Sequence, residues 1–338
     1  MSRLTVFVPD LFAGLAEQSN GIADLKRWPA LSLLLNRADK RPLKSSSVEE
    51  QLRLLIGADA ADSNQLSVPG LTASIDYDCK LQAAMMRADP VHLRADPTQV
   101  LLFNDSSVMP SPEEADALID VLNVGLPELG LSRGRHPARW YFSSETNADQ
   151  FSNSPGTVNG RSIANFLPRD GAMHEFALLM NEAQMLLHGA PVNTDREVQG
   201  VPAINSIWIW GGDLNYGASA KAPELVVGDD VLTAGLARYF AVDWRVEIVL
   251  GEILARIKRS GGDGLVVVGS PTGAIDRDDR VLKIDDFEQR WCAPLLNALR
   301  RFQFGELLLV TDQKSFRLSP WSLLKVWRTR TPIGENRQ

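Results

Sequence analysis

Short apolar runs recur along the chain, and each is soon followed by Gly, Asp or Ser and then by an amphipathic stretch. This alternation is typical of parallel strands connected by helices. The predicted strands are Leu4–Val8, Val100–Phe103, Ser206–Trp210, Glu224–Val227, Gly264–Val268 and Leu307–Val310. The predicted helices are Ser47–Ile56, Pro112–Asn123, Met173–His188, Asp230–Tyr239, Val246–Ser260 and Asp285–Phe302. The pattern therefore predicts an α/β protein.

Start signals mark one helix clearly. The stretch SPEEADALIDVLN opens with Ser111 as an N-cap and carries acidic residues in its first turn. By contrast, Ser143–Asp170 is rich in Asn, Ser, Pro and Gly and has few periodic signals. This segment is interpreted as a long loop or a crossing between domains.

Length and composition limit the architecture and the location. A chain of 338 residues with 44% hydrophobic residues can bury one large core, or one core and a smaller inserted domain. The first apolar run, Leu4–Val8, is too short for a secretory signal or a membrane helix. We therefore expect a cytoplasmic protein with no membrane partner.

The net charge argues against a nucleic-acid-binding protein, and the cysteine content argues against a protein stabilised by disulfides or by a cysteine-metal cluster. The net charge is −7 with 35 basic residues interspersed, whereas nonspecific nucleic-acid binding needs a basic field. The run Arg328 to Arg330 is interpreted as a solvated tail. Cys79 and Cys292 give neither a disulfide framework nor a clustered metal-binding spacing, so both are predicted to be reduced. We expect no nucleic-acid partner.

Acidic residues follow the first and the last predicted strands. Asp10 comes after LTVFVP, and Asp312 comes after LLLVT, where it is followed by Gln313. Ligands and metals bind at the carboxyl ends of parallel strands, so the two carboxylates can converge if their strands are neighbours. The alternative is that each caps the loop or helix that follows it.

Three other segments carry candidate chemistry. Ser45–Ser47 precede a predicted helix, where a hydroxyl can cap the backbone or act as a nucleophile. MMRADPVHLRAD places Arg87, His92 and Arg94 close together, as in an anion-binding loop. LLHGAPVNTDREVQG joins a helix end to a turn that carries Arg196. For each segment a purely structural role is the alternative.

Five segments follow one another in an order that one enzyme family shares. They are MMRADPVHL, SPEEADALIDVLN, NEAQMLLHGAPVNTDREVQGVPAINSIWIWGGD, APELVVGDDVLTAGLARYFAVD and LLLVTDQ. With them the chain resembles the cofactor-independent phosphoglycerate mutases of archaeal type, members of the alkaline phosphatase superfamily, from Leu4 to about Asp312. The third segment is the most specific, since it joins a helix, a Pro-Val-Asn turn, an Arg and a Gly-ended strand.

The resemblance implies an alkaline-phosphatase-like layered α/β sheet with helices on both faces and a smaller inserted α/β domain. We expect residues 1–83 and 171–330 to form the larger, discontinuous domain. The inserted domain is expected at residues 84–170, and residues 331–338 are expected to be a tail.

The resemblance also implies a metal site whose ligands can be compared one by one. Such enzymes transfer a phosphoryl group with two divalent metals and a serine nucleophile. One of their sites takes an Asp after the first strand, the nucleophilic Ser, and an Asp-His pair after the last strand. The matching residues are Asp10, Ser47 (with Ser46 as the alternative), Asp312 and, in place of the His, Gln313.

The second metal site departs further from the family pattern. Thr272 and Ile275 fall where its ligands are expected, and Val48 or Glu49 stands in place of an Asp after the serine. The histidines of the sequence are His92, His136, His174 and His188. None of them lies in the part of the chain that carries the family's metal-binding histidines.

Two arginines match the substrate-binding residues of the family. Arg87 and Arg196 are expected to face one cleft between the larger domain and the insertion, where guanidinium groups can hold phosphate or carboxylate. Other substrate positions differ, because NDSSV replaces a paired-arginine motif after Phe103 and Ala190 replaces a histidine. The partner implied is a small phosphorylated or carboxylate ligand, and the sequence names no protein partner.

The sequence hypothesis is a phosphoglycerate-mutase-like protein, with Ser47 as a vestigial nucleophile, that has lost two-metal phosphoryl transfer and serves binding or regulation. No cofactor is expected beyond, at most, one weakly bound Mg²⁺ or Mn²⁺ at Asp10, Asp312 and Gln313. The first alternative is an active phosphoglycerate mutase or phosphomonoesterase with a reduced metal site. The second is a different enzyme chemistry on the inherited scaffold.

Overall fold

In the residues that the structure describes, the helices pack around two main β-sheets of different size, beside a separate two-stranded pair. The computed structural model describes residues 2–9, 11–12, 27–43, 55, 64–80, 85–144, 153–167, 172–211, 214–216, 222–269, 284–311 and 313–325. None of the helices in these ranges is long and apolar enough to span a membrane.

The larger sheet has seven strands in the order β11-β10-β12-β1-β13-β14-β2. These strands are β1 (Arg3–Phe7), β2 (Asp39–Pro42), β10 (Leu225–Val227), β11 (Asp243–Arg245), β12 (Gly264–Val267), β13 (Glu306–Val310) and β14 (Lys314–Leu318). Strands β11, β10, β12, β1 and β13 pair in parallel, and β14 and β2 add antiparallel pairs. The edge strand β2 is exposed and reads Asp-Lys-Arg-Pro, a composition that discourages pairing with other chains.

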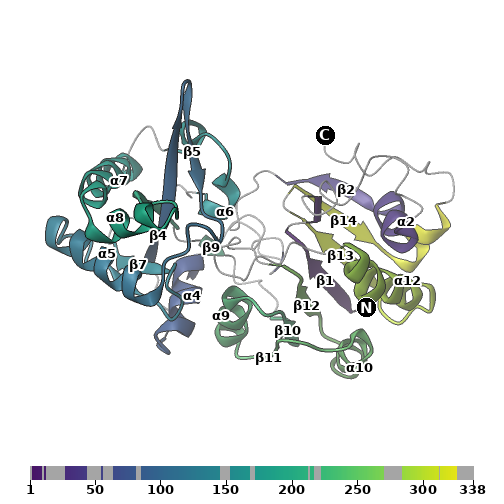
Figure 1. Ribbon diagram of the computed structural model, residues 1–338. Helices are drawn as coiled ribbons and strands as arrows, with labels where there is room; N and C mark the ends of the chain where they lie inside the picture. Colours follow the sequence, from purple (N-terminus) through teal and green to yellow (C-terminus); the bar gives the residue numbers. More distant parts are fainter. Residues whose placement is uncertain are drawn as a thin grey trace.

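The smaller sheet is antiparallel and is formed by one continuous part of the chain. Its strands are β4 (Met85–Asp96), β5 (Gln99–Phe103), β6 (Ser132–Arg133), β7 (Trp140–Ser143) and β8 (Ser206–Trp210). The long strand β4 pairs with β5, β7 and β8, and its hairpin with β5 projects from the molecule (Figure 1). Strands β3 (Asn64–Leu66) and β9 (Leu214–Tyr216) form a separate pair. All of them lie between β2 and β10 in sequence, so the smaller sheet is an insertion.

Helices pack against both sheets. They are α2 (Pro29–Arg37), α4 (Val68–Asp76), α5 (Pro112–Gly125), α6 (Pro155–Val158), α7 (Ala172–His188), α8 (Pro191–Val198), α9 (Val231–Phe240), α10 (Leu250–Ser260), α11 (Ile284–Phe287) and α12 (Ala293–Arg300). A π-helix, η4 (Glu288–Cys292), joins α11 to α12, and 3-10 turns occur at η2 (Ile163–Asn165) and η5 (Pro320–Leu324).

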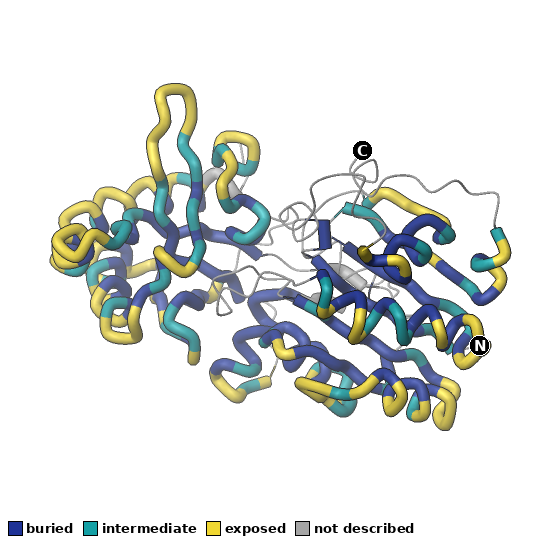
Figure 2. The backbone as a smooth tube through the Cα atoms, turned by 45° about the vertical axis from the view of Figure 1, so that its right-hand side comes forward, coloured by how far each residue is buried: buried dark blue, intermediate teal, exposed yellow. Residues whose placement is uncertain are grey.

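Side chains of β1 alternate between two hydrophobic cores. Leu4 and Val6 pack in the core that contains α2, α10 and α12, whereas Phe7 packs in the core that contains α4, α9 and the smaller sheet. The central strands are buried and the outer turns of the helices are exposed (Figure 2). The larger sheet is thus covered on both faces, which confirms the predicted layered α/β sheet with helices on both faces.

The predicted strands are present, but two pair differently from the expectation. β5 and β8 are antiparallel strands of the smaller sheet, so the prediction of parallel strands is wrong for them. MMRADPVHLRAD was interpreted as a loop and is in fact β4. A proline inside a run argues against a strand, yet Pro90 is accommodated opposite Ile207 of β8.

Some predicted features are not tested by the described residues. The structure describes only Leu55 of the predicted helix Ser47–Ile56. The run Arg328 to Arg330 also lies outside the described residues. The predicted domain boundaries at residues 84 and 170 stay a prediction, since strand pairing does not delimit a domain. The pairing of β8 with β4 shows only that the smaller sheet includes residues beyond 170.

Candidate functional site

The two strands that precede the acidic candidates are neighbours. β1 and β13 pair in parallel with Phe7 opposite Val310, and Val8 N donates to Val310 O at 2.8 Å beyond the last pair. The chain positions of Asp10 and Asp312 therefore follow the carboxyl ends of adjacent strands. The two residues themselves lie outside the described residues, as do Ser46, Ser47, Thr272 and Ile275, so the sharing of a cation by the two carboxylates stays a prediction.

Gln313 lies in the tight connection between β13 and β14. Thr311 Oγ1 accepts hydrogen bonds from Gln313 N at 3.3 Å and Lys314 N at 3.1 Å, and donates to Lys314 O at 2.9 Å. The carbonyl of Gln313 accepts from Leu43 N at 2.9 Å. These bonds fix the backbone of the residue that stands where the family pattern has an imidazole.

Arg87 is completely buried within the smaller sheet. Its Nε donates to Asp89 Oδ1 at 2.8 Å, and its Nη2 lies 2.8 Å from Asp89 Oδ2. Trp210 Nε1 donates to the same Oδ2 at 2.8 Å. The guanidinium also lies over the rings of Trp210 at 5.0 Å and Tyr141 at 5.9 Å. Residues two apart in a strand share a face, which brings Arg87 and Asp89 together.

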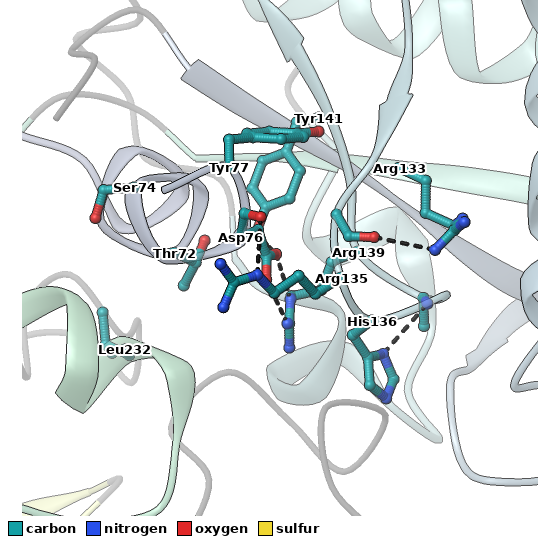
Figure 3. A network of polar contacts seen from close by, with 12 residues as sticks. Thr72, Ser74, Asp76, Tyr77, Arg133, Arg135, His136, Arg139, Tyr141 and Leu232 are labelled. Carbon is teal, nitrogen blue, oxygen red and sulfur yellow. Dashed lines mark hydrogen bonds and ion pairs between the residues drawn. The ribbon is translucent and has the colours of Figure 1, made fainter. Parts of the chain in front are cut away.

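Tyr141 connects Arg87 to a second buried ion pair, at the end of α4. The Tyr141 hydroxyl donates to Asp76 Oδ2 at 2.8 Å, and Arg139 donates to both Asp76 oxygens at 2.7 Å (Figure 3). Burial raises the pKa of Tyr141 well above its usual value, against the lowering effect of the Arg87 charge. Tyr141 therefore remains a hydrogen-bond donor, and the network ties α4 to β7.

Arg196 is also buried, and its bonds hold α8 to neighbouring segments. Its Nε donates to Pro202 O at 2.9 Å and its Nη1 to Glu114 Oε2 at 2.9 Å. Its Nη2 donates to Ser107 O at 3.3 Å and Val108 O at 3.2 Å. Both predicted substrate-binding arginines thus bond to protein acceptors inside the insertion. A ligand would have to displace those acceptors, and the predicted substrate-binding role of Arg87 and Arg196 stays a prediction.

The other basic residues of β4 are separated from Arg87. His92 Nδ1 lies 2.8 Å from Ala203 O. Because a carbonyl only accepts, Nδ1 is the donor in this contact. His92 lines a pocket of about 480 Å³ with His188 and Glu197. Arg94 is exposed and stacks over Phe103 at 4.5 Å. The predicted cluster of Arg87, His92 and Arg94 is therefore not a single anion-binding loop.

In the parts of the chain that the structure describes, no group of three or more His, Cys, Asp or Glu residues could hold a metal ion. Asp10 and Asp312 are not among the residues searched. The predicted single-cation site therefore stays a prediction.

Sequence reasoning missed the Asp76, Arg139 and Tyr141 network. Asp76 is separated by 63 residues from Arg139 and by 65 from Tyr141, and no spacing motif marks either pair. The network became visible only with the packing of α4 against β7.

The fold and the strand-end acids indicate an α/β protein with an inserted antiparallel sheet and a candidate site after β1 and β13. No protein-family sequence model matches the chain. Part of it is related in sequence to the 2,3-bisphosphoglycerate-independent phosphoglycerate mutases, as its motifs indicated.

Two relatives define the extent of this similarity. The mutase of Methanothrix thermoacetophila is 26% identical over 185 residues, which cover 47% of this chain and 45% of that protein. The mutase of Methanosarcina mazei is 26% identical over 218 residues, which cover 55% of this chain and 52% of that protein. The chain thus spans about half the length of the curated relatives it matches.

Two solved structures are similar over most of the chain. A Pyrococcus horikoshii protein aligns with 94% of this chain and 87% of its own, with a TM-score of 0.45 and 13% identity. The cofactor-independent phosphoglycerate mutase from Thermoplasma acidophilum aligns with 94% of this chain and 90% of its own, with a TM-score of 0.36 and 15% identity.

Proposed function

We propose that this chain is a phosphoglycerate-mutase-like protein that has lost two-metal phosphoryl transfer and acts as a binding or regulatory protein. The observation that carries the proposal is Gln313, which replaces an imidazole directly after Asp312 at the end of β13. A neutral amide oxygen is a weaker ligand than imidazole for Zn²⁺. The first metal site would thus lose one of its strong ligands.

The second metal position supports the same conclusion. Thr272 and Ile275 stand where the family pattern has metal ligands, and the isoleucine side chain offers no donor atom. Two adjacent metals are needed to neutralise the transferred phosphoryl group and to activate the nucleophile. Without them the Ser47 hydroxyl is a poor nucleophile at neutral pH.

The internal bonds of Arg87 and Arg196 affect whether these residues could bind an anionic ligand. Arg87 and Arg196 each donate to internal acceptors, so an anion site built on them would compete with bonds that hold the insertion together. We therefore propose that a phosphorylated or carboxylate ligand, if bound, is recognised mainly by other groups.

The alternative is a phosphoglycerate mutase or phosphomonoesterase that works with a reduced metal site. Its support is the similarity to proteins named as 2,3-bisphosphoglycerate-independent phosphoglycerate mutases. Asp10 and Asp312 would then hold one cation beside Ser47.

Metal analysis separates the two functions. The protein is incubated with Mn²⁺ or Zn²⁺, dialysed and measured by elemental analysis, beside the variants Asp10→Asn and Gln313→His. The proposal predicts at most about one equivalent of weakly held metal, and tighter retention of Zn²⁺ in Gln313→His because imidazole suits Zn²⁺. About two equivalents retained by the unaltered protein would contradict the proposal, since that is the content of a complete two-metal site.

A further inference from the structure

A surface groove of about 680 Å³ lies between the start of α10 and the helices η4 and α12. Leu250 and Leu254 of α10 line one side, and Trp291 and Pro294 line the other, which gives the groove an apolar floor. Figure 1 shows α10 and α12 on the larger unit, on the side away from the smaller sheet. The groove is therefore separate from the buried arginines of the insertion.

Large apolar side chains are exposed beside this groove. Val249 lines it and is 71% exposed. Phe302 directly follows the groove residue Arg301 and is 59% exposed. The Phe302 ring packs edge-on against Trp321, which is 66% exposed, with centroids 5.5 Å apart. Single exposed apolar residues are ordinary, but their grouping around an apolar groove is typical of an interaction site.

The backbone of Phe302 adds an independent observation. Its φ is 54°, in the left-handed region, and it lies just after α12, where Phe302 N donates to Leu299 O and Gln303 N to Ala298 O at 3.1 Å. Glycine is the usual residue at such a helix end, because a β-carbon is strained there. An exposed phenylalanine at this position serves neither the helix end nor the core. Its ring contacts Trp321 of the same chain, and the two exposed rings together offer an aromatic surface to another molecule.

The rims of the groove carry opposite charges. Glu247 and Glu252 lie on the α10 side, and Arg290 and Arg301 lie on the side of η4 and α12, all of them exposed. Glu247 and Arg290 lie 4.0 Å apart and form an ion pair within the chain, so the complementary charges offered to another molecule are Glu252 and Arg301. A two-fold axis that runs along the groove would place the α10 rim of one copy against the α12 rim of the other. Glu252 of each copy would then face Arg301 of the other, and each Val249 would approach the apolar floor of the other copy.

We propose that this groove is the interface between two copies of this chain related by a two-fold axis. Charge complementarity selects a second copy as the occupant, because the same surface provides both halves of each ion pair. Exposed apolar residues beside a matching hollow provide the area that association buries. The proposal does not depend on whether the protein transfers phosphoryl groups.

Charge-reversal variants test the pairing directly by sedimentation velocity over a range of protein concentrations. Glu252→Arg would place two positive charges opposite each other at this contact and Arg301→Glu two negative charges, so each variant alone should weaken the dimer by at least about tenfold. An equimolar mixture of the Glu252→Arg and Arg301→Glu proteins should form a heterodimer, since the two reversed charges would face each other across the interface. Glu182→Arg, at an exposed position on α7, is the matched control and should dimerise like the unaltered protein.

A second variant separates folding from association. Phe302→Gly removes the exposed ring and relieves the left-handed backbone, so it should weaken self-association without lowering the melting temperature measured at dilute, monomeric concentration. A protein that stays monomeric at all concentrations up to about 100 μM, well above the Kd range of stable dimers, would overturn the proposal. So would a dimer that both charge reversals leave unchanged, because it would use another surface.

Discussion

Replacing Arg87 by methionine tests whether this residue is a structural ion-pair partner. Both side chains of the Arg87–Asp89 pair are 0% exposed and are joined by two contacts of 2.8 Å. Removing one partner of a buried pair leaves an uncompensated charge, which costs about 3–5 kcal/mol of folding free energy. Loss of the guanidinium over Trp210 adds about 1 kcal/mol, and packing of the methionine side chain offsets part of this. We expect a destabilisation of about 4 kcal/mol.

The assay is urea unfolding followed by tryptophan fluorescence. The double variant Arg87→Met/Asp89→Asn removes the unpaired charge and keeps an acceptor for Trp210 Nε1, so it should lose only about 1–2 kcal/mol. The matched control is Arg133→Met, whose partner Asp116 is bound at 2.6 Å while the two side chains are 26% and 56% exposed. That exposed pair should contribute less than about 1 kcal/mol. Equal losses in Arg87→Met and Arg133→Met would refute the reasoning from burial.

Three further changes have expected outcomes. Ser111→Ala breaks the capping box in which Ser111 Oγ accepts from Glu114 N at 3.1 Å, and chemical denaturation should show a loss of about 1 kcal/mol. Arg196→Lys cannot reproduce the planar set of bonds to Glu114 and the carbonyls, so the same measurement should show a loss of about 2 kcal/mol, and no loss would contradict a structural role. The hydrogen bond from Arg27 lowers the pKa of Asp285, so its stabilising effect is present above the unfolded pKa of about 3.9 and is lost as pH falls through the folded pKa. The stability difference between the unaltered protein and Asp285→Asn should therefore shrink between pH 7 and pH 3, and a difference that grows would contradict this sign.

Periodicity predicted the central sheet because its strands are short, apolar and buried on both faces. Leu4 to Val8 and Leu307 to Val310 have no polar side chain apart from Thr5, and both form strands of one sheet. The predicted N-cap at Ser111 is likewise a local feature, since the acceptor and the donor are three residues apart. Signals of this kind are contained within a few residues and need no tertiary information.

The buried polar contacts depend on distant segments and could not be predicted. Asp89 is only two residues from Arg87, and their side chains meet because β4 is a strand. The sequence does not show this strand clearly, because Pro90 lies within it. Trp210, whose Nε1 donates to Asp89 Oδ2, is 121 residues from Asp89 in the sequence. The family match predicts a ligand-binding role for Arg87, whereas its burial depends on strand pairing that no local pattern reveals.

The most direct test of the proposed loss of phosphoryl transfer is turnover of 3-phosphoglycerate by the purified chain with added Mn²⁺, beside Ser47→Ala. The account predicts no turnover above that of Ser47→Ala, because Gln313, Thr272 and Ile275 leave too few ligands for two metals. Robust conversion to 2-phosphoglycerate that Ser47→Ala abolishes would contradict the account and establish an active mutase with a reduced metal site.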